Sequence, residues 1–324
     1  MSSLAEIQQP IAGNIRHYET FIASILRSDN AFVSSICDYI LARRGKQLRP
    51  LLVLLSAALH GEIDSRTYTG AAVVEMIHTA SLIHDDVVDE AFVRRGAPSV
   101  NALWHSRTAV LVGDYIFART YHSSLREGAW DLLAEVTRAI HEISEGELIQ
   151  TEQAETLSIT RPVYLDVIYK KTGSLIGACG AVGALSVHAD SSAVDRMRAF
   201  GDNLGIAFQI KDDILDFSPM EETGKPSGGD LRERKITLPL LYVLENSSAA
   251  ERNRLLDKLS QVQEHPEYVA ELQQIVIDNG GLEHARSCMM SYRDQAVSLL
   301  ADYPASPVKD SLLGFADFVL ERNK

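Results

Sequence analysis

Apolar residues recur at spacings of three and four positions along most of this chain, and alternation of β-branched with polar residues is rare. That spacing is the period of an α-helix that buries one face, whereas a half-buried strand alternates at every second residue. Only 10 Pro and 20 Gly interrupt the 324 residues. We therefore predict an all-α protein. Helices are expected over residues 4–27, 30–43, 48–60, 66–91, 106–127, 129–157, 162–189, 191–218, 237–246, 248–260, 266–279, 282–303 and 306–322.

Nothing in the sequence marks a boundary between two domains. It contains no low-complexity linker and no repeat of fixed period. We therefore expect residues 1–324 to form a single large helical bundle, with the broadly apolar helices 66–91 and 191–218 near its centre. The stretch from Gly177 to Ala184 has almost no side-chain bulk. It predicts a place where two helices approach closely.

The composition argues against several classes of protein. Lys and Arg number 31 and Asp and Glu number 44, and a formal net charge of -13 would repel nucleic acid. Cys37, Cys179 and Cys288 are far apart and form no zinc or disulfide pattern, which predicts a reducing, cytoplasmic location. The first residues lack a signal-peptide layout, and no apolar run is long enough to cross a bilayer.

Two acid clusters share the pattern acid-acid-x-x-acid. They are Asp85-Asp86-x-x-Asp89 and Asp212-Asp213-x-x-Asp216. With 44 acids in the chain, chance alone gives about one such match, so the spacing by itself is weak evidence. Both clusters lie within strongly apolar helices, however. Like charges one turn apart destabilise a helix, and the loss of hydration costs each carboxylate several kcal/mol unless it is compensated.

Positive charge must therefore stand near these acids. Carboxylates without nearby His or Cys suit a hard cation, and Mg²⁺ in particular takes a few carboxylates together with water and substrate phosphates. A di-iron site is the alternative metal centre. It would require Glu-x-x-His pairs on facing helices, and the sequence contains no such paired motif.

Basic residues stand at several breaks in the helical pattern. Each one alone is typical of an ordinary surface charge, but together with the acid clusters they indicate a site for two polyanionic groups. One group would be held through metal and the other by Arg and Lys directly. His78 lies seven residues before Asp85 and shares its inward face, with a structural role as the alternative. The basic residues are Lys46, Arg49, Arg94, Arg95, Lys170, Lys171, Lys225 and Lys235.

The segment 219–235 is polar, rich in glycine and long for a connection inside a domain. It directly follows the second acid cluster. We therefore predict a lid or binding loop, with a plain solvent-exposed loop as the alternative.

Five blocks, occurring in order from about residue 40 to the end, resemble the polyprenyl synthetase family of trans-isoprenyl diphosphate synthases. Each block alone is weak evidence, but all five in order are highly specific. The blocks are Gly45-Lys46-x-x-Arg49-Pro50; Asp85-Asp86-x-x-Asp89 with Arg94-Arg95-Gly96; Lys171-Thr172; Phe208-Gln209-x-x-Asp212-Asp213-x-x-Asp216; and Gly224-Lys225 followed by Lys235.

This resemblance implies the isoprenoid synthase type of all-α bundle, with a deep central cavity. It implies head-to-tail condensation of isopentenyl diphosphate onto an allylic diphosphate, with three Mg²⁺ ions in each site. A homodimer is implied as well. Because the product is apolar, we also expect transient contact with a membrane when it is released.

The resemblance also implies roles for the residues of the motifs. The metal ligands would be Asp85, Asp89 and Asp212. The acids that support them would be Asp86, Asp213 and Asp216. The allylic diphosphate would be held by Arg94, Lys171, Lys225 and Lys235. The isopentenyl diphosphate would be held by Lys46, Arg49, His78 and Arg95. The residues near the developing carbocation would be Thr172 and Gln209.

In this family, product length depends on the depth of the cavity beneath the first acid cluster. Ala80 and Ser81 are small where short-chain members of the eukaryotic type carry aromatics, and Ile77 lies farther down. The first cluster also lacks the two-residue insertion of bacterial short-chain forms. One helical turn rises about 5.4 Å, close to one isoprene unit. We therefore predict a long product, octaprenyl diphosphate, for quinone side chains, with a farnesyl or geranylgeranyl diphosphate synthase as the alternative.

Two other classes share the expected fold. A non-catalytic helical partner could lose acids from one cluster, but all six are present. A terpene cyclase or head-to-head synthase would generally lack the Lys46 and Arg49 anion site. At the end of the chain, Arg322 and Lys324 are candidates to fold over the diphosphates, and a frayed terminus is the alternative.

Overall fold

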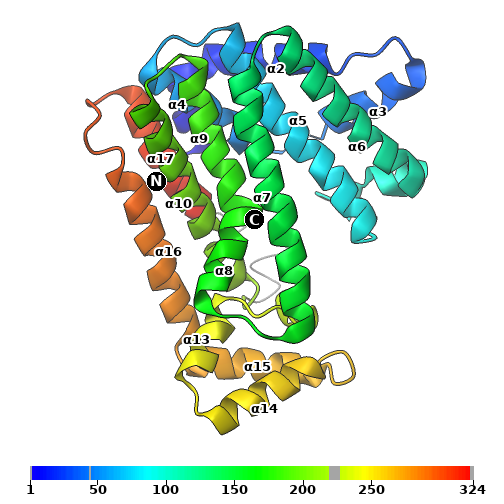
Figure 1. Cartoon of the computed structure of the whole chain (residues 1–324), viewed down its shortest axis with the longest axis vertical. Helices are drawn as coiled ribbons and strands as arrows, with labels where there is room; N and C mark the ends of the chain where they lie inside the picture. Colours follow the sequence, from blue (N-terminus) through cyan, green and yellow to red (C-terminus); the bar gives the residue numbers. More distant parts are fainter. Residues whose placement is uncertain (1, 44, 219–226, 322–324) are drawn as a thin grey trace.

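The structure is a computed structural model that describes residues 2–43, 45–218 and 227–321 (Figure 1). Its described part is helical, as predicted, and the only strands in it form a hairpin of two residues a side. The first half of the chain contains α1 Leu4–Gln8, η1 Gln9–Ile11, α2 Ala12–Ile25, α3 Ala31–Leu41, α4 Leu48–His60, α5 Ser65–Val88, β1 Val93–Arg94, β2 Ala97–Pro98, α6 Val100–Arg126 and α7 Trp130–Thr156. The second half contains α8 Arg161–Ile168, η2 Tyr169–Gly173, α9 Ser174–Ser186, α10 Ser191–Leu215, α12 Gly229–Arg232, α13 Leu238–Asn246, α14 Ala249–Ser260, α15 Glu267–Asp278, α16 Gly281–Ser298 and α17 Pro307–Glu321.

Several predicted boundaries are wrong, each for a local reason. The helix predicted over 4–27 is split, because a 3₁₀ turn that contains Pro10 separates α1 from α2. The helix predicted over 66–91 ends at Val88, and Glu90, with φ of 51°, turns the chain into the hairpin. The helix predicted from residue 106 begins at Val100, with a kink at His105.

The helix predicted over 162–189 is interrupted by η2, a five-residue π-helix that carries Lys170, Lys171 and Thr172. A π-turn has a wider backbone ring than an α-helix and often occurs at functional sites. The segment predicted as a loop over 219–235 contains the short helix α12. Residues 219–226, which form the first part of the predicted lid, lie outside the described residues.

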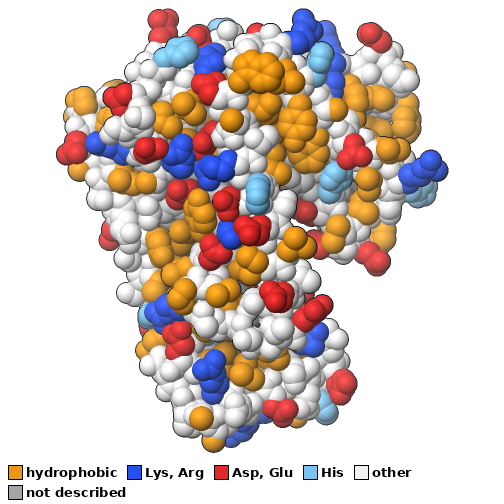
Figure 2. Space-filling view, in the orientation of Figure 1, with side chains coloured by type: hydrophobic (Ala, Val, Ile, Leu, Met, Phe, Trp, Pro, Cys, Tyr) orange, Lys and Arg blue, Asp and Glu red, His pale blue; other side chains and the backbone are white. Residues whose placement is uncertain are grey.

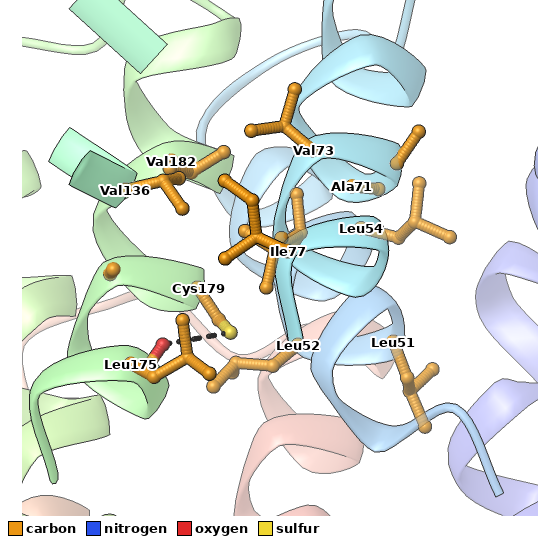
Figure 3. Packing of buried hydrophobic residues seen from close by; sticks show 14 of the residues in the cluster. Leu51, Leu52, Leu54, Ala71, Val73, Ile77, Val136, Leu175, Cys179 and Val182 are labelled. Carbon is orange, nitrogen blue, oxygen red and sulfur yellow. Dashed lines mark hydrogen bonds between the residues drawn. The ribbon is translucent and has the colours of Figure 1, made fainter. Parts of the chain in front are cut away.

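Two apolar clusters form the core, and α10 contributes to both of them. Phe200 and Leu204 belong to the larger cluster, whereas Ile210 and Ile214 belong to the smaller cluster around α13 to α15. The other helix predicted near the centre, α5, packs against α4, α6, α7 and α9. Figure 3 shows Ile77 of α5 in the larger cluster, with Leu52 of α4 and Val182 of α9 among the residues around it.

Each of these two central helices begins at a capping aspartate. Asp64 accepts hydrogen bonds from the N–H groups of Arg66 and Thr67 at the start of α5, and Asp190 accepts one from Ala193 at the start of α10. The two acid clusters lie at the opposite, C-terminal ends of these helices. Within the described ranges, none of the helices has the length and apolar character needed to cross a membrane.

The glycine-rich stretch lies where α9 packs tightly against α10, as the sequence predicted. A Cβ atom added to Gly180 would lie 2.1 Å from the carbonyl oxygen of Met197, and one added to Gly201 would lie 2.3 Å from that of Ile176. Backbone atoms cannot move aside as a flexible side chain can. The close approach of α9 and α10 therefore requires glycine on both helices.

We expect Gly180→Ala to lower the free energy of unfolding by about 1–3 kcal/mol, because the methyl group would force α9 away from α10. Chemical denaturation followed by circular dichroism measures this change. Gly13→Ala is the matched control, since Gly13 is exposed in α2 and a Cβ atom there meets nothing within 4 Å. The control variant should be unchanged or more stable by about 1 kcal/mol. Equal stabilities for the two variants would contradict the close-packing explanation.

Candidate active site

The first acid cluster lies where α5 ends and the hairpin begins. Asp85 and Asp86 occupy the last turn of α5, and Asp89 is its C-cap, with its N–H donating to the carbonyl oxygen of Asp85. Burial, together with the negative charges of Glu147 and Asp89, raises the pKa of Asp85 to about 6. The C-terminal end of a helix dipole disfavours anions as well. Arg94 and Lys171 oppose this rise in pKa only in part, so that the exposed pair of Asp85 and Asp89 lies in a net negative environment.

Asp86 points away from this pair and is compensated by the protein itself. Its carboxylate is buried and accepts a hydrogen bond of 2.6 Å from Nε of Arg94, which the hairpin brings back over α5. The Asp86 backbone carbonyl accepts a longer hydrogen bond from Asn101. In this structure Arg94 is therefore paired with an acid of the first cluster.

A positively charged pocket lies next to Asp86, between α3, α5 and the hairpin. Its lining contains three arginines and two acids together with His78 and Tyr39; the arginines are Arg43, Arg94 and Arg95, and the acids are Glu75 and Asp86. Burial and the positive charges of Arg49, Arg95 and Arg94 hold the pKa of His78 well below its usual range. A neutral imidazole among three guanidinium groups suits a site that receives an anion.

The Gly45–Arg49 block approaches this pocket from the side of α4. A Cβ atom on Gly45 would lie 2.7 Å from the Cζ atom of Arg95, so that glycine lets the Arg95 guanidinium lie against the backbone. Lys46 is exposed, and its Nζ lies 5.6 Å from the centre of the Phe318 ring. The structure thus brings Arg49, His78 and Arg95 together, while Lys46 lines a neighbouring pocket with residues of α1, α2 and α4.

The π-helix η2 carries the Lys171-Thr172 block. The Lys171 ammonium lies 3.0 Å from Oε1 of Glu147 and donates a hydrogen bond to Oε1 of Gln150, both on α7. The Thr172 hydroxyl donates to Oε1 of Gln209 at 2.9 Å. This bond ties η2 to α10 one turn before the second acid cluster.

In the second acid cluster, Asp212 is exposed and Asp213 is buried. The Tyr164 hydroxyl donates to Oδ2 of Asp213 at 2.5 Å, and Nε2 of Gln209 donates to Oδ1 at 3.4 Å. Burial raises the pKa of Asp213 to about 6, although these hydrogen bonds oppose the rise. Asp213 is therefore held in place by the protein, as Asp86 is in the first cluster.

The Asp216 carboxylate accepts hydrogen bonds from the backbone N–H groups of Gly229, at 2.8 Å, and Asp230, at 3.1 Å. Both groups lie in the first turn of α12. Asp216 thus fixes the end of the segment whose first part lies outside the described residues. Of the three acids in the cluster, Asp212 is the one whose side chain stays exposed.

A second pocket joins η2 to this cluster. It is lined by Lys171, Gln209, Asp213, Asp230 and Lys235, among others. Burial and the charges of Asp213 and Asp216 raise the pKa of Asp230 to about 7. The Lys235 ammonium is paired with Glu233. The predicted residue Lys225 lies outside the described residues.

The two clusters face a shared region. Lys171 lines the second pocket, and its positive charge also lowers the pKa of Asp85 in the first cluster. Glu147 acts on both Asp85 and Lys235. Figure 2 shows the molecule hollowed on the side where α5 ends, above the lobe formed by α14 and α15.

Sequence reasoning missed four residues of this region. Tyr164 carried a weak signal, because it stands seven residues before Lys171 on the same predicted helix. Glu147, Gln150 and Asp230 carried none, since a polar residue on an amphipathic helix or in a loop is ordinary. Only the fold brings these residues to the motif side chains.

The sequence matches the polyprenyl synthetase family model over residues 30–276. It is 36% identical over 290 residues to a short chain isoprenyl diphosphate synthase of Methanothermobacter thermautotrophicus, covering 88% of this chain and 89% of that protein. It is 31% identical over 323 residues to the octaprenyl diphosphate synthase of Escherichia coli, covering 99% and 100%. A polyprenyl synthase from Caulobacter crescentus, solved in complex with calcium and isoprenyl diphosphate, is similar with a TM-score of 0.89 and 32% identity, covering 99% and 98%. The chain therefore belongs to the polyprenyl synthetase family, as its five sequence blocks predicted, and is a prenyltransferase of the trans-polyprenyl diphosphate synthase type.

Proposed function

We propose that this enzyme condenses isopentenyl diphosphate head-to-tail onto an allylic diphosphate, with Mg²⁺, to make a long all-trans polyprenyl diphosphate. One observation carries the proposal: the exposed acids at the ends of α5 and α10 border a region that also contains Lys171. Such a combination suits a metal-bound diphosphate, because the acids take the metal and the ammonium takes the phosphate.

The donor set suits Mg²⁺. Among the described residues, no three His, Cys, Asp or Glu side chains are grouped closely enough to hold a metal ion by themselves. Mg²⁺ does not need such a cage, since it keeps several waters and shares substrate phosphates. Burial is the main cause of the raised pKa of Asp85, and the negative charges of Glu147 and Asp89 add to it, so that a bound cation would stabilise the ionised carboxylate. Asp85, Asp89 and Asp212 would hold the metal, for which we propose three ions per site.

The remaining acids keep these ligands in position. Asp86 is tied to Arg94, and Asp213 is tied to Tyr164 and Gln209. A carboxylate that is already hydrogen-bonded to the protein fixes the turn that carries its neighbours. The exposure of Asp85, Asp89 and Asp212 supports direct metal binding by these three acids. The hydrogen bonds of the other three acids support a positioning role for them.

Cleavage of the allylic C–O bond separates a carbocation from a diphosphate anion. Bound Mg²⁺ would supply positive charge that stabilises the leaving diphosphate. Lys171, Lys235 and Arg94 add charge-assisted hydrogen bonds from fixed positions. Lys225 is proposed for the same role from outside the described residues. Thr172 follows Lys171 directly and donates a hydrogen bond to Gln209. We propose that the side-chain oxygens of these two residues lie near the allylic carbocation.

The pocket between α3, α5 and the hairpin is proposed to bind isopentenyl diphosphate. His78 and Arg95 line it, the positive charges of Arg49 and Arg95 lower the pKa of His78, and Lys46 lies on the adjoining segment. No protein base is needed for the final proton loss in the mechanism that the family implies, because the released diphosphate accepts that proton. The residues around the cation then have to exclude water rather than transfer a proton.

The small residues below Asp85 support a long product, with octaprenyl diphosphate as our proposal and quinone side chains as its use. This chain is 36% identical to a synthase with a short-chain name and 31% identical to one with an octaprenyl name. Product length is therefore inferred from the residues of this chain. Ala80 is fully buried, Ser81 is half-buried and Ile77 lies in the core. A short-chain synthase would be favoured if bulky side chains stood at these positions.

We propose that residues 1–324 act as one domain in a homodimer. Apolar side chains are exposed along α6 and α7, and burying them between two copies would remove them from water. They include Leu103, Val110, Leu111, Leu125, Trp130 and Leu148. We also propose a cytoplasmic location, from the dispersed cysteines, and brief membrane contact on product release, from the apolar nature of the product.

We expect radiolabel from isopentenyl diphosphate to enter an acid-labile polyprenol diphosphate when the enzyme receives farnesyl diphosphate and Mg²⁺. Asp212→Asn should lower kcat/KM by about 10²- to 10³-fold, because the variant loses one ligand of the metal whose charge would stabilise the leaving diphosphate. Asp257→Asn, on the exposed face of α14, is the control and should be fully active. Absence of incorporation by the natural enzyme would support the non-catalytic partner or a cyclase instead.

Mg²⁺ activation should weaken as the pH falls below about 6. The pKa of Asp85 is raised to about 6, so this carboxylate is ionised above that pH and protonated below it. Since a proton and a metal ion compete for the same oxygens, the Mg²⁺ concentration for half-maximal activity should rise by up to about tenfold per pH unit below 6. Titration of Mg²⁺ at pH 5.5, 6.5 and 7.5 measures this. A pH-independent Mg²⁺ requirement would exclude Asp85 as a ligand.

Ser81→Phe and Ala80→Phe should shorten the product, because an aromatic ring would close the space below Asp85. Reverse-phase chromatography of the dephosphorylated products measures chain length. Ser81→Ala is the matched control and should leave the length unchanged. An unaltered product distribution in both Phe variants, with normal thermal stability, would show that these residues are not the wall.

A further inference from the structure

Glu147 is an acid of α7 that belongs to neither cluster. Its Oε1 lies 3.0 Å from the Lys171 ammonium, and the same ammonium donates to Gln150 one turn farther along α7. Lys171 lines the pocket next to Asp213 and acts on Asp85. In the structure, Lys171, which we propose to bind the allylic diphosphate, therefore forms an ion pair with Glu147 of the protein itself.

The backbone is arranged so that this pair can form. The residue before Glu147 is Gly146, where a Cβ atom would lie 2.8 Å from Cβ of Lys170, 3.0 Å from Cγ of Lys171 and 3.2 Å from the Lys171 backbone nitrogen. Only glycine lets the π-turn of η2 come this close to α7. The Lys171 side chain consequently starts against the α7 backbone and ends beside Glu147.

Glu147 also lies within electrostatic reach of both halves of the site. Its negative charge, together with burial and Asp89, raises the pKa of Asp85, and the same charge contributes to the raised pKa of Lys235. A free diphosphate entering this region would meet three carboxylates, those of Glu147, Asp85 and Asp89. A diphosphate that already carries divalent cations would be attracted by the same three groups.

We propose that Glu147 is a specificity-determining residue that holds Lys171 until the substrate arrives and so favours metal-loaded diphosphates over free ones. The inference rests on the function proposed above. A free diphosphate has to displace Glu147 from Lys171 and approach its carboxylate, whereas metal ions on the diphosphate give that carboxylate a new partner. Glu147 thereby reduces unproductive binding of diphosphates that lack metal.

The strength of the pair suits such an exchange. The Glu147 side chain is 55% exposed and the Lys171 side chain 21%, so that water reaches the pair from the Glu147 side and it contributes about 1 kcal/mol. A diphosphate offers several charged oxygens and can replace one carboxylate without difficulty. For the same reason, Glu147→Gln should fold normally, with an unchanged melting temperature.

The test measures binding of inorganic pyrophosphate by calorimetry, once in EDTA and once with saturating Mg²⁺. In EDTA, Glu147→Gln should bind pyrophosphate about three- to fivefold more tightly than the natural protein, because Lys171 is released and a repelling charge is removed. With Mg²⁺ the gain should vanish or reverse. Glu145→Gln is the matched control, since Glu145 forms a 3.0 Å pair with the neighbouring Lys170 and should leave both affinities unchanged.

The double variant Glu147→Gln with Lys171→Gln tests whether Glu147 acts by pairing with Lys171 or only by repelling the diphosphate. If Glu147 acts through Lys171, the gain in EDTA should disappear when Lys171 is absent. A gain that persists without Lys171, an unchanged or weaker affinity of Glu147→Gln in EDTA, or no pyrophosphate binding by either protein would overturn the proposal. Condensation by the natural enzyme is measured separately, so that failure of the proposed function can be told apart from failure of this inference.

Discussion

Repulsion between carboxylates is the constraint around which this structure is organised. Six aspartates gather at the C-terminal ends of α5 and α10, where the helix dipole and partial burial both disfavour negative charge. Three of them accept hydrogen bonds from the protein that hold their carboxylates in place. Asp86 has Arg94, Asp213 has Tyr164 and Gln209, and Asp216 has the first N–H groups of α12. Asp85, Asp89 and Asp212 have exposed side chains, and we propose that a diphosphate and its metal ions bind there.

Departures from regular helix bring the positive charges to these acids. The hairpin after α5 turns Arg94 onto Asp86, and the π-helix η2 turns Lys171 toward α7. The close approach of η2 to α7 depends on Gly146, and Gly45 leaves room for the guanidinium of Arg95, the neighbour of Arg94 in the hairpin. Regular helices therefore build the core and carry the acids, while short irregular segments between them carry Arg94 and Lys171.

Much of this architecture could be predicted from residue patterns. The helical period gave α4 to the residue, and the glycine run correctly located the contact between α9 and α10. The change of helix type was missed, because a polar break in an apolar helix does not show that the backbone widens there. Lys170, Lys171 and Thr172 read as the middle of one long helix, and only packing against Gly146 and α10 explains why the backbone widens there. The hairpin at residues 93–98 was missed as well, since strands of two residues are too short to show the alternation of apolar and polar residues.

The sequence by itself determined the chemistry of the site: six acids in two spaced clusters, cations at the breaks, and apolar helices to carry them. It did so because side-chain type and helical period are properties of neighbouring residues. Tertiary packing set the hydrogen-bond partners of Asp86, Asp213 and Asp216, since Arg94, Tyr164 and Gly229 reach these acids through folding rather than through helical spacing. It also decided that Glu147 faces Lys171, because electrostatic compensation depends on distances between helices, and the periodicity of a single helix carries no information about them.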